Sequence, residues 1–94
     1  MATTAKILVV DDERSIRDLL SVYLKREGFE VECAADGLAA LECCKARTFD
    51  IVITDIKMPK LDGIGLLRRV REFAPETIFI MITAFGSFES AQDS

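Results

Sequence analysis

FDIVITD, residues 49–55, contains four consecutive β-branched residues at positions 51–54. Such a run is typical of a β-strand. A strand without a polar side is expected in the middle of a parallel sheet that helices cover on both faces. The run ends on Asp55, and open α/β sheets place their functional sites at the carboxyl ends of their strands. Asp55 is therefore a candidate site residue, although a lone aspartate at such a position more often just ends a strand.

Three other segments have the composition of strands. Residues 6–10 (KILVV) and 77–83 (TIFIMIT) are apolar runs of the kind found in central strands. Residues 29–34 alternate apolar and acidic or small side chains, which predicts a half-exposed strand at a sheet edge. Glu30 and Glu32 would discourage that edge from pairing with another sheet.

Helical patterns separate these strands. The first predicted helix has one apolar stripe, formed by Ile16, Leu19, Leu20, Tyr23 and Leu24. The second runs from residue 37 to about 47, with Asp36 as its predicted N-cap. The third follows Asp62-Gly63, and its predicted inward-facing residues are Ile64, Leu67, Val70 and Phe73.

Strict alternation of strands and helices predicts a parallel sheet with right-handed crossovers. The alternating strand belongs at one edge, and the strands at 6–10 and 49–55 belong inside. The expected architecture is therefore an α/β, flavodoxin-like fold of three layers with strand order 2-1-3-4. Its topological switch point lies between the first and third strands.

The fourth predicted strand, residues 77–83, is as apolar as the central ones, yet nothing after it in this sequence could cover its far side. The helical pattern that follows Ser87 continues for about two turns without a glycine or basic stop. We therefore expect residues 1–94 to be a single domain that is incomplete at its C-terminus. A bare apolar edge should pair with something, which predicts a homodimer or strand-exchanged oligomer through residues 77–83.

The composition excludes several other classes of protein. The 94 residues are enough for one small domain, and the net charge of −4 argues against direct nucleic-acid binding. No apolar run approaches the roughly 20 residues of a membrane span, and the N-terminus has no signal-peptide pattern, so a cytoplasmic location is expected. Three cysteines without a C-x-x-C pattern, in a chain without histidine, do not favour a zinc site or a disulfide framework.

Acidic residues follow two of the strands that meet at the switch point. Asp11 and Asp12 follow the first strand and Asp55 ends the third, while Thr83 ends the fourth. Three converging carboxylates without a basic partner repel one another, and a divalent cation such as Mg²⁺ relieves that repulsion. A carboxylate beside such a metal can attack a phosphoryl group, with a hydroxyl such as that of Thr83 supporting the charge. Taken singly, Asp11-Asp12 would indicate helix N-terminal charge and Thr83 a strand residue.

The chain resembles, along essentially its whole length, the receiver domain of two-component response regulators. The stretches that carry the resemblance are ILVVDDE (7–13), AADG (34–37), DIVITDIKMP (50–59), LDG (61–63) and ITA (82–84). The resemblance implies that Asp55 accepts a phosphoryl group from a sensor histidine kinase. It also implies that Asp12, Asp55 and the backbone carbonyl of Lys57 contact Mg²⁺ directly, with Asp11 acting through water.

The resemblance further implies that Thr83, with Ala84, forms the switch that contacts the phosphoryl group. The segment ITAFGS, residues 82–87, is similar to receivers that precede the ATPase and DNA-binding domains of enhancer-binding transcriptional activators, so the implied output is regulation of transcription. Members of the family continue into a fifth strand, a phosphate-contacting lysine followed by proline, and a fifth helix. This sequence lacks all three, in agreement with the expected truncation.

Three alternatives differ from a receiver in their chemistry. Phosphatases with an aspartate nucleophile need a second aspartate two residues later, where this chain has Lys57. A flavodoxin-type mononucleotide binder needs a phosphate-cradling loop after the first strand, where Asp12-Glu13 would repel the ligand. A docking or dimerisation module with the receiver fold but no phosphoryl chemistry stays open, and Mg²⁺-dependent phosphorylation of Asp55 would separate it from a receiver. In none of the favoured readings is the chain a classical enzyme.

Overall fold

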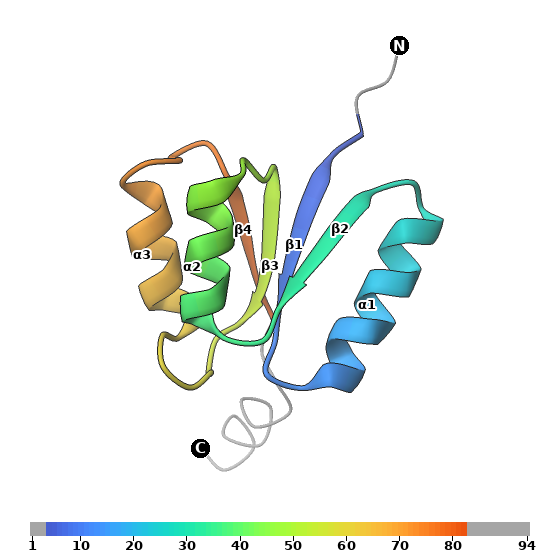
Figure 1. Ribbon diagram of the computed structural model, residues 1–94, viewed down its shortest axis with the longest axis horizontal. Coiled ribbons are helices and arrows are strands. Elements are labelled where there is room, and N and C mark those ends of the chain that lie inside the picture. Colours follow the sequence, from blue (N-terminus) through green and yellow to red (C-terminus); the bar gives the residue numbers. More distant parts are fainter. Residues whose placement is uncertain (1–3, 83–94) are drawn as a thin grey trace, which may run out of the picture.

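The computed structural model describes residues 4–82 of the chain. A four-stranded sheet forms the middle of three layers, with α1 over one face and α2 and α3 over the other (Figure 1). The strands are β1 (Lys6–Val10), β2 (Glu30–Ala34), β3 (Ile51–Asp55) and β4 (Ile78–Ile82). The helices are α1 (Arg14–Arg26), α2 (Gly37–Ala46) and α3 (Gly63–Arg71).

All neighbouring strands are parallel, and their order is β2-β1-β3-β4, which confirms the flavodoxin-like topology predicted from the sequence. Val10 pairs with Ala34 on one side and with Thr54 on the other. The carboxyl ends of the three strands therefore lie level with one another. This register brings the segments that follow β1 and β3 to one place at the edge of the sheet.

The two outer strands have different surfaces. β2 exposes the two glutamates predicted to protect an edge, Glu30 and Glu32. β4 begins one residue later than predicted, and Ile78 and Ile80 are 60% and 48% exposed. Thr83, the last residue of the predicted fourth strand, lies outside the described residues. Within residues 4–82, β4 is hydrogen-bonded to β3 alone.

The main core lies between the sheet and the layer of α2 and α3. Strand residues Leu8, Val10 and Val52 pack there against Leu66 and Val70 of α3, and all five are fully buried. Burial of such side chains is worth about 1.5–3 kcal/mol each. The sheet, and with it the ends of β1 and β3, is therefore held on a rigid support.

The buried side of α3 differs from the predicted one. Leu66 and Val70 are buried, whereas Ile64 is 41% exposed. Gly63, Leu66 and Val70 are spaced i, i+3 and i+7, so they form one stripe, and Ile64 lies well away from it around the helix. Phe73, which was also predicted to face inward, lies beyond the end of α3, where helical spacing no longer applies.

α1 is also buried less than its apolar stripe predicted. Ile16, Leu20 and Leu24 are half-buried, whereas Leu19 and Tyr23 are exposed. The half-buried residues are spaced four apart and form the narrow strip that contacts β1 and β2. In the described part of the chain, no element packs on the side of α1 that carries Leu19 and Tyr23.

Candidate functional site

Asp11, Asp12 and Asp55 form a cluster at the carboxyl ends of β1 and β3. One carboxylate oxygen of each residue lies within 4.8 Å of those of the other two. Asp11 directly follows β1 and Asp55 is the last residue of β3, the strand paired with β1. The parallel register therefore brings together the three carboxylates that the sequence placed at the switch point.

Asp11 is buried and fixed by hydrogen bonds on both sides. Its carboxylate oxygen Oδ1 accepts a hydrogen bond of 2.9 Å from the backbone N–H of Glu13. Its own backbone N–H donates to the carbonyl of Ala34 on the neighbouring strand at 3.2 Å. Its backbone carbonyl accepts a 2.7 Å hydrogen bond from Nη1 of Arg17.

Asp55 is buried as well, with 8% of its surface exposed. Its Oδ1 accepts a 3.2 Å hydrogen bond from the backbone N–H of Lys57, two residues along the chain. The hydroxyl of Thr54, on the same strand, donates to the Asp55 carbonyl at 2.9 Å. Asp12, in contrast, is exposed, so the cluster opens to solvent on its side.

Burial raises the pKa of Asp11 above its ordinary value, and the negative charges of Asp55, Asp12 and Glu13 raise that pKa further. The hydrogen bond from the Glu13 backbone N–H acts in the opposite direction, because it stabilises the ionised carboxylate. Mutual repulsion at the site was predicted from the sequence. For Asp11 it acts together with burial, which is the largest single cause of the raised pKa.

The donor set of this cluster suits Mg²⁺. Three carboxylates converge, and hard divalent cations prefer oxygen ligands, including one or two carboxylates. The ion pairs between described residues join Arg14 to Asp18, Arg47 to Glu32 and Lys60 to Asp36, so none of them neutralises the cluster. The N–H of Lys57 binds Asp55, which keeps the peptide of Lys57, the third predicted ligand, at the site.

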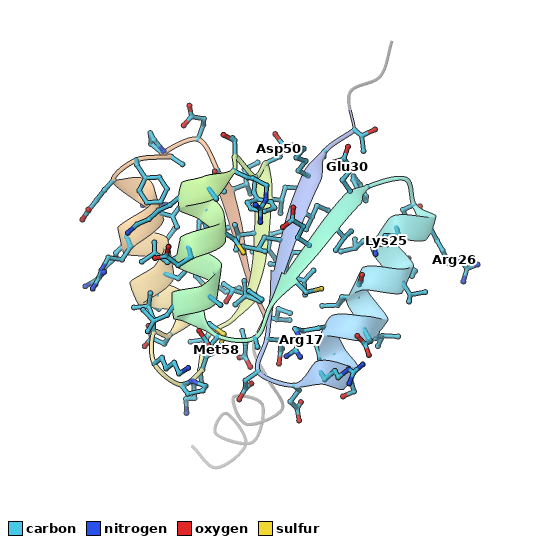
Figure 2. The ribbon with its side chains drawn as sticks, in the orientation of Figure 1. Arg17, Lys25, Arg26, Glu30, Asp50 and Met58 are labelled. Atoms are coloured by element: carbon cyan, nitrogen blue, oxygen red, sulfur yellow. The ribbon has the colours of Figure 1, made fainter. Side chains whose placement is uncertain are left out.

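Arg17 makes a contact with the site that was not predicted from the sequence. It lies in the first turns of α1 at the carboxyl end of the sheet, the same end as Met58, as Figure 2 shows. Arg17 lies one helical turn after Glu13, so the spacing alone could have placed it over the loop that carries the acidic pair. Thr83 and Ala84, the predicted switch residues, lie outside the described residues, and their roles stay predictions.

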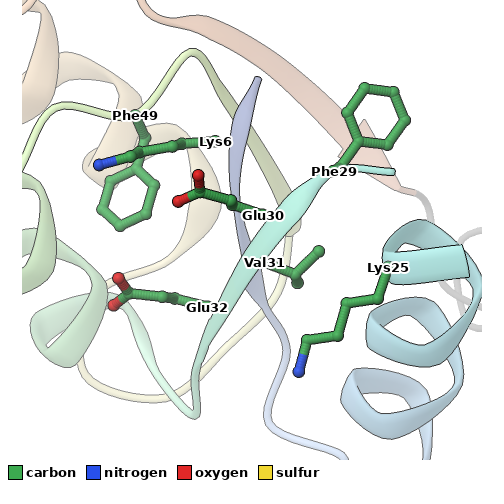
Figure 3. A pocket seen from close by; sticks show the side chains of 7 residues that line it. All are labelled: Lys6, Lys25, Phe29, Glu30, Val31, Glu32 and Phe49. Atoms are coloured by element: carbon green, nitrogen blue, oxygen red, sulfur yellow. The ribbon is translucent and has the colours of Figure 1, made fainter. Parts of the chain in front are cut away.

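A cavity of about 410 Å³ lies at the opposite end of the sheet. Its lining includes Lys6 and Glu30, the first residues of β1 and β2, together with Phe49 (Figure 3). The acidic cluster lies at the carboxyl ends of β1 and β3. The cavity is therefore separate from the candidate site.

The fold and the acidic cluster define a class: flavodoxin-like α/β domains that carry an acidic site at the switch point. Within that class, the chain belongs to the response regulator receiver domain family, whose model matches residues 7–94. Receiver domains take histidine kinases as phosphodonors in two-component systems and generally bind Mg²⁺ in an acidic pocket. They are generally not classical enzymes.

Two relatives illustrate the range of this family. Regulatory protein AtoC of Escherichia coli is 37% identical over 94 residues, which are 100% of this chain and 20% of AtoC. Sporulation initiation phosphotransferase F of Bacillus subtilis is 38% identical over 89 residues, or 95% of this chain and 72% of that protein. The chain thus matches most of one relative but only about a fifth of the other.

Among solved structures, the response regulator TrrA of Thermotoga maritima, in complex with Mg²⁺-BeF, is similar with a TM-score of 0.83. Its sequence is 37% identical, and the match covers 93% of this chain and 76% of that one. None of the helices between residues 4 and 82 has the length and apolar character needed to cross a membrane.

Proposed function

We propose that this chain is the phospho-acceptor of a cytoplasmic two-component system. Asp55 takes a phosphoryl group from a sensor histidine kinase with the help of Mg²⁺, and the change regulates an output such as transcription. The observation that carries the proposal is the convergence of Asp11, Asp12 and Asp55 within 4.8 Å at the switch point. Membership of the receiver domain family supports it.

In the proposed transfer, an Asp55 carboxylate oxygen forms a bond to phosphorus. The phosphorus–nitrogen bond of the donor's phosphohistidine breaks, and its electron pair stays on the imidazole nitrogen. The product is an acyl phosphate on Asp55. The backbone N–H of Lys57 holds Oδ1 of Asp55 at 3.2 Å, which leaves Oδ2 to attack. Burial of Asp55 restricts access of water to the reacting carboxylate.

Asp12, Asp55 and the backbone carbonyl of Lys57 would hold the Mg²⁺, with Asp11 acting through water. When bound, the ion neutralises the charge on the transferred phosphoryl oxygens. Asp11 is oriented for this role by the Glu13 N–H at 2.9 Å. The complex of the similar protein TrrA with Mg²⁺-BeF supports a magnesium site in this fold.

Thr83, with Ala84, would contact the phosphoryl group and switch the conformation. The register supports this assignment, because Asp55 pairs with Ile82 and residue 83 comes next along the chain. The change from an unmodified to a phosphorylated Asp55 would then be transmitted to the segment that follows β4.

Intact mass after incubation with acetyl phosphate and Mg²⁺ tests the proposal. We expect one added phosphoryl group, which is absent in Asp55→Asn and in the presence of EDTA. The Asp55→Asn chain must have an unchanged circular dichroism spectrum to serve as the control. If the chain without substitutions is folded and gains no mass, the proposal is overturned.

A second candidate is a docking module without phosphoryl chemistry, and the surface of β4 favours it. Ile78 and Ile80 are 60% and 48% exposed on an outer strand that carries no charged residue. Such an edge can pair with a strand of a second copy. The phosphorylation experiment separates the two candidates, because a docking module would not take up the phosphoryl group.

A further inference from the structure

Two Asp-Gly pairs begin the helices that flank the loop leaving Asp55. Asp36 caps α2 by accepting the N–H of Ala39 at 2.8 Å. Asp62 caps α3 by accepting the N–H of Gly65 at 2.7 Å. Capping accounts for the two aspartates. It does not account for the glycines that follow them.

Gly37 is placed where no side chain would fit. A β-carbon at this position would lie 1.8 Å from the backbone oxygen of Leu61 and 2.7 Å from its β-carbon. Gly28 is the glycine of the described chain that has a positive φ, so Gly37 needs no unusual backbone conformation. Alanine is also the better helix former. Gly37 is therefore required by the close approach of the loop to α2.

Gly63 has the same relationship to the other end of the loop. A β-carbon there would lie 2.5 Å from the backbone oxygen of Asp55 and 3.2 Å from the α-carbon of Ile56. The N–H of Gly63 donates to the carbonyl of Ile56 at 2.9 Å. The start of α3 thus lies directly against the end of β3, next to the proposed acceptor.

Lys60 adds a polar contact between the loop and α2. Its Nζ lies 3.5 Å from Oδ2 of Asp36, the residue that caps α2 through its other carboxylate oxygen. Lys60 has a φ of 71°, a left-handed conformation that is uncommon for a lysine. The turn that this conformation makes brings Leu61 onto Gly37.

We infer that Gly37 and Gly63 are positioning residues. Because they have no side chain, α2 and α3 can pack closely against the loop of residues 56–62 and hold it where the backbone N–H of Lys57 points toward Asp55. The inference rests on the proposed function, since Lys57 matters there as a ligand through its carbonyl and as a donor to Asp55 at 3.2 Å. Gly37 lies on α2, which carries none of the site residues. It acts only through the loop and touches neither the phosphoryl group nor the metal.

The test compares Gly37→Ala with Gly28→Ala in the 94-residue chain. Both substitutions add one methyl group. At Gly28, φ is 98° and nothing lies within 4 Å of the added carbon, so the control is strained without touching the loop. Amide spectra of ¹⁵N-labelled protein, recorded without metal, report the chemical shift and hydrogen exchange of Lys57. Titration with MgCl₂ then gives the Mg²⁺ affinity.

We expect Gly37→Ala to speed exchange of the Lys57 amide and to weaken Mg²⁺ binding about tenfold or more, the usual effect of losing support behind a metal ligand. Gly28→Ala should change neither, although it lowers Tm. Equal exchange and equal Mg²⁺ affinity in Gly37→Ala and the unmodified chain would overturn the inference. If the chain without substitutions does not bind Mg²⁺, the proposed function is contradicted instead. The hydrogen exchange rate of the Lys57 amide, measured without metal, would still decide the inference.

If Gly37→Ala does not fold, Lys60→Asn decides the matter. Asparagine tolerates the left-handed conformation but cannot form the ion pair with Asp36. We expect faster Lys57 exchange and a Mg²⁺ affinity about twofold to fivefold lower, as suits an exposed ion pair. Unchanged exchange in a folded Lys60→Asn chain would overturn the inference.

Discussion

Asp11 and Asp55 come from neighbouring parallel strands, are both buried, and have carboxylate oxygens within 4.8 Å of each other. The pairing of Val10 with Thr54 sets this relationship, because each aspartate directly follows one member of that pair. A slip of one residue would turn every side chain of a strand to the opposite face of the sheet. The core that fixes the register therefore also fixes the site.

Asp11 should make the metal-free chain less stable as the pH rises. Burial, followed by the charges of Asp55 and Asp12, raises the pKa of Asp11 in the folded state. The folded chain then holds this proton more tightly than the unfolded chain, so the free energy of unfolding falls as the pH rises from the unfolded pKa through the folded pKa. In EDTA at about pH 7, we therefore expect Asp11→Asn to raise the unfolding free energy, measured by urea denaturation.

The same variant has a built-in control. Asparagine keeps an oxygen that can accept the Glu13 N–H, so the hydrogen bond at 2.9 Å is retained. The gain should shrink as the pH is lowered toward the ordinary pKa of an aspartate, because Asp11 is then protonated in both the folded and the unfolded chain. A loss of stability on substitution at neutral pH, in the absence of metal, would contradict the origin assigned to the raised pKa.

Mg²⁺ should offset the loss of stability that ionisation of Asp11 causes in the metal-free chain. A ligand that binds only the folded chain stabilises it by about 2.7 kcal/mol at a concentration of 100 Kd. We expect thermal unfolding to shift upward with MgCl₂ in the unmodified chain and to shift much less in Asp12→Asn. Asp12 is exposed, so its replacement should not disturb the fold in EDTA. Equal shifts in both chains would place the ion elsewhere.

Leu66 and Ile64 should differ strongly in their contribution to stability. Leu66 is fully buried against Val52 and the other core residues, whereas Ile64 is 41% exposed on the same helix. We expect Leu66→Ala to cost about 2–5 kcal/mol in urea denaturation and Ile64→Ala less than about 1 kcal/mol. The reverse order would show that α3 is rotated about its axis relative to this structure.

The 94-residue chain should self-associate through β4. Its outer edge carries exposed isoleucines and no charge, whereas the other edge of the sheet carries Glu30 and Glu32. Ile80→Lys should abolish association in sedimentation experiments, because a charged residue would have to enter the paired edge. Val22→Lys makes a similar change on the exposed surface of α1 and should not abolish it. A single monomer boundary at high concentration would exclude pairing through β4.

The sequence predicts the sheet better than it predicts the helix faces. Continuous apolar runs and one alternating strand are enough for the order β2-β1-β3-β4, because a strand covered on both faces has no polar side at all. For a helix, two orientations about its axis can fit the pattern of apolar residues almost equally well. Ile64 and Leu66 are equally apolar, and only the packing of α3 on the sheet decides which one is buried.

The acidic cluster was predictable for a similar reason. Asp11 and Asp12 follow one apolar strand, Asp55 ends another, and parallel strands end at the same edge of the sheet. The close approach of Leu61 to Gly37 was not predictable, since Leu61 lies in a loop that is distant from Gly37 in the sequence. The contact of Arg17 with the Asp11 carbonyl also depends on how α1 leaves β1, which the sequence pattern does not specify.

Phosphorylation tests most directly whether Asp55 is the acceptor of the phosphoryl group. The unmodified chain, Asp55→Asn and Leu19→Ala, which alters an exposed residue of α1, would be incubated with acetyl phosphate and Mg²⁺ and their intact masses recorded. We predict one phosphoryl group on the unmodified chain and on Leu19→Ala, none on Asp55→Asn, and none on any chain in EDTA. A folded, unmodified chain that gains no mass, or an Asp55→Asn chain that gains as much, would contradict the assignment of Asp55 as the acceptor.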